Sequence, residues 1–239
     1  MSSKPKVLVG CPISSHREDV IDQYIDSVKS LTYPNYEVLL LDNSADNNMF
    51  DRIKGKVPVQ KTKRIEKLGE MLARDRNILR KKAIDEGFDY FLSLEQDVIP
   101  PKDVIEKLLA NEKKVCSGLY FNMYSTLGPN NEPFTELRPV FSTWIDETQK
   151  EIRVVRNIGF HGVFPSRLMP ICSGGVGCVL IAREVLEKIF FRTEPEFKTF
   201  DDVFFYEDCY TKGIDILLDS GVLCMHHYKP WSKELRVNV

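Results

Sequence analysis

The strongest constraint on the fold is an alternation of short apolar runs and helical segments over the first 120 residues. Apolar runs at 6–11, 38–41, 90–94 and 115–120 have the length of buried strands. Between them, apolar residues recur with helical spacing over 18–31, over 69–85 and after Pro100-Pro101. Strands that alternate with helices predict an α/β fold, with a mostly parallel central sheet and helices on both faces.

The second half of the chain is less regular. The Gly-, Pro- and Asn-rich stretch 122–138 predicts a long loop, and the alternating stretch 151–156 predicts a half-exposed strand. Strands are then expected at 178–181 and 214–218, and helices at 184–191 and 202–212. Neither an internal repeat nor a linker poor in apolar residues interrupts the sequence, so we expect a single domain over 1–239.

Composition and charge exclude several classes of protein. Lys plus Arg number 33 against 35 Asp plus Glu, for a formal charge of −2, which disfavours a nucleic-acid partner. The longest apolar runs are too short for a signal-peptide core or a membrane span, so we expect no transmembrane segment. None of the six cysteines forms C-x-x-C, so we expect buried, reduced thiols in the cytoplasm, with a disulfide left open.

Common nucleotide-binding and hydrolase motifs are missing from the sequence. There is no G-x-x-x-x-G-K-[ST], H-E-x-x-H or G-x-S-x-G, and the glycines at 174–177 do not fit the dinucleotide fingerprint. The stretch 11–17, which follows the first expected strand, contains no glycine. This disfavours a sugar nucleotidylyltransferase, which needs a glycine-rich phosphate loop there.

Polar residues lie at the ends of the expected strands. Ser14, Asp42 and Asn43 follow the first two, and the pair Glu95 and Asp97 follows the third. Ligands of open parallel sheets bind at the carboxyl ends of the strands, so we expect these residues to border a binding site.

Glu95 and Asp97 form a candidate metal site. Alternate residues of an extended segment point the same way, so both carboxylates can face one Mg²⁺ or Mn²⁺ ion. The adjacent His226 and His227 offer an imidazole, and only one of them can face the same ion. Solvated carboxylates and a structural histidine pair remain the alternatives.

Several of these segments resemble family 2 glycosyltransferases with the GT-A fold. The stretch 33–44, Y-P-N-Y-E-V-L-L-L-D-N-S, is similar to their second-strand segment. Arg76-Asn77 resembles their A-R-N stretch, although Asp75 replaces the alanine. The run 94–97, L-E-Q-D, resembles their D-x-D signature with Glu95 in the first position.

The later motifs follow in the family's order. Gly174-Gly175 precedes an apolar strand as in the family, and Glu207-Asp208 resembles the family's E-D pair. His226 falls where some members place a third metal ligand. The resemblance runs from about residue 7 to residue 227 and departs most at 122–156.

The resemblance implies a metal-dependent glycosyltransferase that moves a sugar, with inversion, from a UDP- or GDP-sugar to a hydroxyl of a glycan, lipid-linked or protein acceptor. Residues 1–120 are then the nucleotide-sugar half and 121–239 the acceptor and catalytic half, including a small antiparallel region. Mn²⁺ or Mg²⁺ is held by Glu95, Asp97 and His226. Asp208 is the catalytic base, and Glu207 positions the acceptor or begins a helix. The implied donor-binding residues are Pro12, Ser14, Asp42, Asn43, Arg76, Gln96, Gly174 and Gly175.

A second hypothesis is a GT-A-like module without catalysis that binds a nucleotide or a glycan. The presence of Asp97, Asp208 and His226 together favours the enzyme. The segment 229–236 mixes cations with apolar residues, and we weigh peripheral contact with an anionic membrane against a solvated tail.

Overall fold

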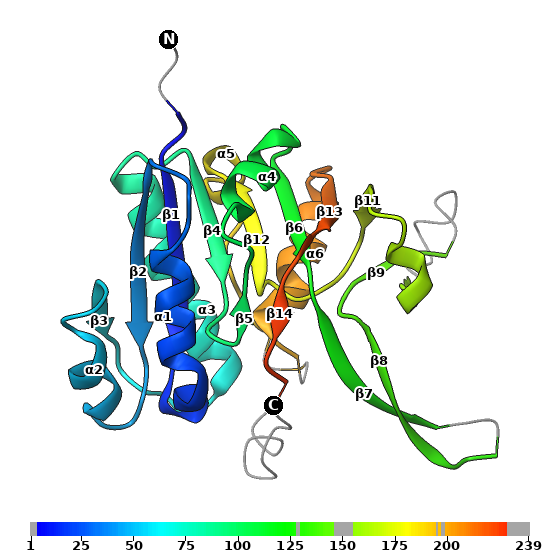
Figure 1. Ribbon diagram of the computed structural model, residues 1–239, viewed down its shortest axis with the longest axis horizontal. Coiled ribbons are helices and arrows are strands. Elements are labelled where there is room, and N and C mark those ends of the chain that lie inside the picture. The colour runs from blue at the N-terminus through cyan, green and yellow to red at the C-terminus, as the bar shows by residue number, and fades with distance from the viewer. Residues whose placement is uncertain (1–3, 128–129, 146–154, 195, 197–198, 229–239) are drawn as a thin grey trace.

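An eight-stranded sheet runs through the computed structural model, which describes residues 4–127, 130–145, 155–194, 196 and 199–228 (Figure 1). The strand order is β11-β13-β6-β12-β4-β1-β2-β3. Only β11 and β12 run against the direction of the others, which confirms the mostly parallel sheet. The strands are β1 Val7–Ile13, β2 Tyr36–Asp42, β3 Val59–Lys61, β4 Tyr90–Leu94, β6 Val115–Leu119, β11 Leu168–Ile171, β12 Cys178–Ala182 and β13 Ile216–Leu223.

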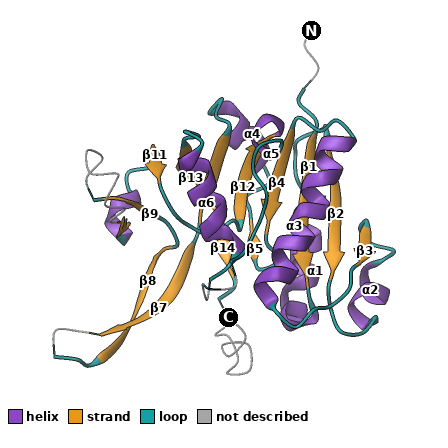
Figure 2. Cartoon of the chain, turned by 180° about the vertical axis from the view of Figure 1, so that it is seen from behind, coloured by secondary structure: helices purple, strands orange, loops and turns teal. Residues whose placement is uncertain are grey.

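Helices cover both faces of the sheet, as predicted. In Figure 1, α1 and α4 lie in front of the sheet, and Figure 2 shows α3 and α6 on the opposite side. The amphipathic spacing explains this placement, because α1 buries the single stripe Ile21, Tyr24, Ile25 and Val28. The helices are α1 Ile21–Lys29, α2 Asn48–Ile53, α3 Leu68–Asp85, α4 Val104–Ala110, α5 Arg183–Leu186 and α6 Asp201–Thr211, with 3₁₀ turns η1 Ser15–Val20 and η3 Phe160–Val163.

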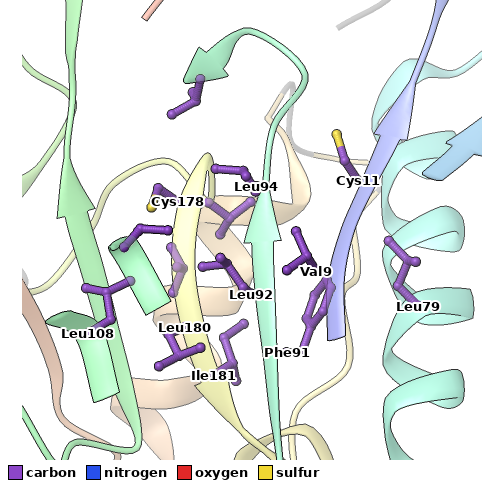
Figure 3. Close-up of a cluster of buried hydrophobic side chains, with 14 of the residues drawn as sticks. Val9, Cys11, Leu79, Phe91, Leu92, Leu94, Leu108, Cys178, Leu180 and Ile181 are labelled. Carbon is purple, nitrogen blue, oxygen red and sulfur yellow. The ribbon is translucent and has the colours of Figure 1, made fainter. Parts of the chain in front are cut away.

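The core lies along β1, β4 and β12, where side chains from both faces are buried (Figure 3). Gly10 lets α3 pack closely on β1, since a Cβ at this position would lie 2.8 Å from Leu79 and 2.9 Å from Phe91. All six cysteines are free thiols, and all but Cys172 are buried. The five buried cysteines act as small apolar residues in this core.

The prediction of a long loop at 122–138 is wrong. Strands β7 Phe121–Leu127 and β8 Pro133–Pro139 form an antiparallel hairpin that extends from the body of the protein (Figure 1). Phe121, Met123 and Leu137 share one face of it, so an apolar alternation is present but hidden among turn-forming residues. Two smaller antiparallel pairs join β9 Ser142–Trp144 to β10 Val155–Asn157, and β5 Val98–Ile99 to β14 Met225–His226.

Other boundaries also differ from the sequence prediction. Two short elements, α2 and β3, lie in the polar stretch after Asp42, where the sequence pattern predicts neither a helix nor a strand. The helix predicted at 184–191 ends at Leu186, and the strand predicted at 214–218 begins at Ile216 and continues to Leu223. Residues 151–154 of the predicted half-exposed strand and the segment 229–236 lie outside the described residues. Among the described helices, none has the length and hydrophobicity needed to cross a membrane.

Candidate functional site: a cavity at the carboxyl ends of β1 and β4

A cavity of about 490 Å³ opens at the carboxyl ends of β1 and β4, the edge of the sheet where the sequence predicts a ligand site. The structure brings most of the predicted site residues into its wall. These are Pro12, Ser14, Asn43, Arg76, Glu95, Gln96, Asp97, Gly174, Gly175 and His226. Asp42, Glu207 and Asp208 do not line it. Arg17, Arg64, Asp201 and Asp202 also line it, and the sequence did not indicate any of these four as a site residue. Tyr120 and Tyr124, whose rings can stack on a sugar, line it as well.

Asp97 and His226 approach each other from different elements. His226 lies on β14, which pairs with β5 directly after Asp97, and its Nε2 is 3.6 Å from Asp97 Oδ2. The other ring nitrogen, Nδ1, lies 2.8 Å from the Phe121 carbonyl oxygen, which fixes the orientation of the ring. Burial alone lowers the pKa of His226, but the nearby negative charge of Asp97 outweighs it and raises the pKa above its ordinary value.

The structure also answers which of the two histidines faces the cavity. His226 lines it, whereas His227 does not. The backbone N–H of His227 donates to the Asp97 carbonyl oxygen at 2.8 Å, which ties the end of β14 to the Glu95–Asp97 segment.

Glu95 is held by an arginine. Arg76, on α3, donates from Nη2 to Glu95 Oε1 at 2.5 Å and from Nη1 to Asp201 Oδ1 at 2.5 Å. The arginine is 3% exposed. Burial lowers the pKa of Arg76, but the charges of Asp201 and Glu95 raise it overall, so the guanidinium stays charged. Because carboxylates occupy both Nη groups, this arginine is a link between β4 and α6 rather than an open diphosphate ligand.

Gln96, between the two acidic residues, holds the loop that follows β1. Its Oε1 accepts from the Ser14 backbone N–H at 2.8 Å, and its Nε2 donates to the Ser14 and Arg17 carbonyl oxygens at 3.2 and 2.9 Å. The loop that carries Ser14 therefore takes its position from the E-Q-D segment.

The acidic pair that reaches the cavity is Asp201-Asp202, at the start of α6. Burial raises the pKa of Asp202 to about 6, and the neighbouring Asp201 charge adds to this effect. Asp208 instead accepts hydrogen bonds from Arg192 Nε and Nη2 at 2.9 and 2.8 Å. The sequence held a signal for this pair, because Asp201-Asp202 lies at the start of the helix predicted at 202–212, where acidic residues are favoured.

Asp42 is also placed differently from its predicted role. It is fully buried and accepts from the Ser44 backbone N–H and from Lys61 Nζ, both at 2.9 Å. Its neighbour Asn43 lines the cavity and donates from Nδ2 to Asp75 Oδ2 at 2.9 Å. Asp75, the departure from the family's A-R-N stretch, thus orients the Asn43 side chain.

Gly174 and Gly175 allow close packing at the cavity wall. A Cβ at Gly174 would overlap Phe141, and a Cβ at Gly175 would overlap the Tyr120 hydroxyl. The Tyr206 hydroxyl donates to the Gly175 carbonyl oxygen at 3.3 Å. The glycines bring the 173–177 backbone against buried rings, which a side chain would prevent.

The carboxylate and imidazole groups of the cavity wall are possible ligands of a divalent cation. Within the described residues, no group of three or more His, Cys, Asp or Glu side chains has the arrangement of a metal site. Asp97 and His226 nonetheless offer an oxygen and a nitrogen donor within 3.6 Å of each other. Mg²⁺ and similar ions often use one or two protein ligands and complete their shell with water and substrate phosphates, so this pair suits such an ion.

Comparisons with known proteins agree with this architecture. No family model and no curated protein sequence matches the chain. Solved structures do match. The crystal structure of A197 from STIV is 18% identical with a TM-score of 0.50, and the match covers 94% of this chain and 86% of that one. S. aureus TarS is 17% identical with a TM-score of 0.58, and GalNAc-T7, solved with UDP, GalNAc and Mn²⁺, is 14% identical with a TM-score of 0.63.

The matches to TarS and GalNAc-T7 each cover 94% of this chain but only 37% and 44% of those longer proteins. Both are glycosyltransferases, and at these identities the likeness shows the fold alone. The chain therefore has a GT-A-like glycosyltransferase fold, as the resemblance in the sequence implied.

Proposed function

We propose that this protein is a glycosyltransferase that moves a sugar, with inversion, from a nucleoside-diphosphate sugar to an acceptor hydroxyl. The observation that carries the proposal is the content of one cavity in a GT-A-like fold. Its wall contains Asp97 and His226, which lie close enough together to bind one metal ion. It also contains the carboxylate of Asp202, whose pKa is raised. GalNAc-T7, which shares the fold, was solved with UDP, GalNAc and Mn²⁺.

The nucleoside of a UDP- or GDP-sugar is assigned to the part of the cavity lined by Pro12, Ser14 and Asn43. Asp42 supports this region through its contacts with Lys61 and Ser44 and does not contact the ligand. Gly174 and Gly175 shape the wall around the donor, and Gln96 fixes the Ser14 loop.

Asp97 and His226 are proposed to hold Mn²⁺ or Mg²⁺, which when bound neutralises charge on the diphosphate. Glu95 is assigned to the ion pair with Arg76, so it supports the site rather than binding the ion directly. The pKa of Glu95 is raised to about 7 overall. Burial is the largest cause, the Arg76 charge opposes it, and the nearby Asp97 charge adds to it.

We assign the catalytic base to Asp202 in place of Asp208. In an inverting transfer, the acceptor oxygen attacks the anomeric carbon and loses its proton to a base. Asp202 lines the cavity, and a pKa of about 6 leaves it ionised yet basic enough near neutral pH. Asp208 lies outside the cavity and is committed to Arg192, and Glu207 also lies outside it.

The acceptor is assigned to the side of the cavity formed by the β7–β8 hairpin. Asn122 and Tyr124 of β7 line the cavity, and the Arg138 guanidinium lies 4.0 Å from the centre of the Tyr124 ring. An aromatic ring beside polar groups suits a glycan or another hydroxyl-bearing acceptor, including a lipid-linked or protein one.

A non-catalytic module that binds a nucleotide or glycan is the second candidate, favoured by the ion pair that occupies Glu95. A donor-hydrolysis assay separates the two. UDP- and GDP-sugars are incubated with the protein in Mn²⁺ or EDTA, and free sugar and its anomeric configuration are followed by NMR. Release in Mn²⁺ that is lost in Asp97→Asn supports the enzyme. Binding of UDP or GDP without turnover of any donor supports the module.

A further inference from the structure

Arg17 is a second arginine in the cavity wall, next to the proposed metal ligand Asp97. It lies within η1, directly after β1, and is only 8% exposed. Its backbone angles, φ −117° and ψ 32°, interrupt the helical geometry of the turn. The chain thus places a buried cation beside the E-Q-D segment.

The guanidinium is incompletely bonded by the protein. Its Nη2 donates to the His227 carbonyl oxygen, while its Nε is buried and makes no hydrogen bond. That Nε lies 3.7 Å from Asp97 Oδ2, which is beyond hydrogen-bond distance. A buried donor without a partner costs about 1–3 kcal/mol, so the protein leaves part of the hydrogen-bonding capacity of this guanidinium unused.

The backbone of Arg17 is fixed from two directions. Its carbonyl oxygen accepts from Gln96 Nε2 at 2.9 Å, and its N–H donates to the Ser14 carbonyl oxygen at 3.1 Å. Gln96 itself follows β4, so the sheet sets the position of the arginine. A donor that is already in place before the ligand arrives costs little reorganisation, which is what stabilisation of developing charge requires.

We propose that Arg17 binds the diphosphate of the donor and stabilises the charge that the leaving group acquires; this inference rests on the proposed function. The bond between the anomeric carbon and the diphosphate oxygen breaks, and its electron pair stays on that oxygen. Arg17 donates a hydrogen bond to the diphosphate and keeps its proton. The acceptor oxygen forms the new bond to the anomeric carbon, and its proton goes to Asp202.

The other arginines of the cavity suit this role less well. The Nε of Arg76 is likewise buried without a hydrogen bond, but carboxylates hold this guanidinium at both Nη groups, Glu95 at one and Asp201 at the other. Arg64 lies at the Asn43 end of the cavity, where its Nη1 is 3.5 Å from the Asn43 carbonyl oxygen. Arg17 is the arginine beside Asp97, and a guanidinium fork matches phosphate oxygens in geometry and charge.

Binding measurements test the proposal without relying on turnover. UDP and GDP are titrated by calorimetry, and uridine and guanosine by NMR, into wild type, Arg17→Gln and Arg17→Lys, in EDTA and in Mn²⁺. We expect Arg17→Gln to weaken the preferred nucleoside diphosphate about 10- to 100-fold in both conditions. The affinity for the nucleoside stays unchanged, and Arg17→Lys recovers part of the loss.

Arg80→Gln is the matched control. Arg80 is also 8% exposed and donates from Nε to the Leu186 and Ile189 carbonyl oxygens at 2.6 and 2.8 Å, away from the cavity wall. It reports the effect of removing an equally buried guanidinium, and we expect it to leave nucleotide affinity unchanged.

Three results overturn the inference while leaving the proposed function standing. They are an unchanged diphosphate affinity in Arg17→Gln, an equal loss for the nucleoside, and a loss confined to Mn²⁺, which assigns the effect to Asp97 and its ion. If wild type binds neither UDP nor GDP, the proposed function fails and this inference fails with it.

Discussion

Arg192 holds Asp208 through two hydrogen bonds, from Nε at 2.9 Å and from Nη2 at 2.8 Å. Asp208 is the residue that the sequence resemblance implies as the catalytic base. Its contact with Arg192 lies outside the cavity. Asp202 and Asp208 are six positions apart on α6, which rotates one side chain about 240° around the helix axis from the other. The two carboxylates therefore serve different surfaces of one helix.

The first prediction separates these two carboxylates. Asp202→Asn lowers kcat at least about a hundredfold, because general-base help is worth on the order of 10² to 10⁴ in rate. Asp208→Asn keeps kcat within a few-fold of wild type and costs about 1 kcal/mol of stability through its lost ion pair with Arg192. Steady-state kinetics, with a sugar nucleotide that wild type turns over, measure kcat. Urea unfolding of both variants measures their stability. A hundredfold loss in Asp208→Asn with normal turnover in Asp202→Asn contradicts this assignment and makes Asp208 the base, as the sequence resemblance implies.

The second prediction concerns the buried link between β4 and α6. Arg76→Met leaves the fully buried Asp201 without its partner and lowers the free energy of unfolding by about 3–5 kcal/mol. The double variant Arg76→Met, Asp201→Asn recovers part of this loss, since no unpaired buried charge remains. Urea denaturation followed by circular dichroism measures both. If the double variant is as unstable as the sum of the single ones, the two residues are not coupled.

Much of the fold could be predicted from the sequence, because apolar periodicity is a local signal. The runs that became β1, β2 and β4 and the stripes on α1 and α3 each lie within a dozen or so residues. The hairpin of β7 and β8 escaped prediction because its alternation is diluted by Asn, Thr and Pro.

The site was less predictable, because its contacts cross the sheet. Asp42 ends a strand as expected, yet its partner Lys61 comes from β3, a short strand without a strong apolar signal. Arg17 is a lone arginine in a polar turn, and only the fold places it beside Asp97. Side-chain partners distant in sequence leave no periodic trace. Strand-end carboxylates and the histidine pair indicated a shared site, and the motif resemblance then favoured His226 over His227.

The third prediction is a pH dependence that arises from Asp202. Burial raises its pKa from 3.8 to about 6 in the folded protein, so the folded state binds the proton more tightly than the unfolded state. The resulting stability is fully present below about pH 4 and is lost as the pH rises to about 6. Asp202→Asn is uncharged at every pH, so it gains stability on wild type by on the order of 1 kcal/mol across this window, allowing for partial exposure.

Urea unfolding at constant ionic strength from pH 4 to pH 7 measures this difference. Comparing the variant with wild type cancels the titration of other carboxylates, such as Asp22, whose pKa is lowered by hydrogen bonds from Lys56 and Arg52. A difference that stays flat, or one in which wild type gains on the variant as the pH rises, contradicts the raised pKa of Asp202.

The last prediction tests the close packing at Gly175. In Gly175→Ala the new methyl group overlaps the buried Tyr120 hydroxyl, so either the 173–177 backbone or the tyrosine must move. Tyr120 cannot move without losing the hydrogen bond that its hydroxyl accepts from the Gly177 N–H at 2.9 Å. We expect a loss of about 1–3 kcal/mol in unfolding free energy, together with weaker binding of the donor nucleotide, because this backbone forms part of the cavity wall.

Gly55→Ala is the control, since no atom lies within 4 Å of its added Cβ, and it should leave nucleotide affinity unchanged. Equal effects of the two substitutions on nucleotide affinity, measured by calorimetry, rule out a packing role for Gly175 in shaping the site.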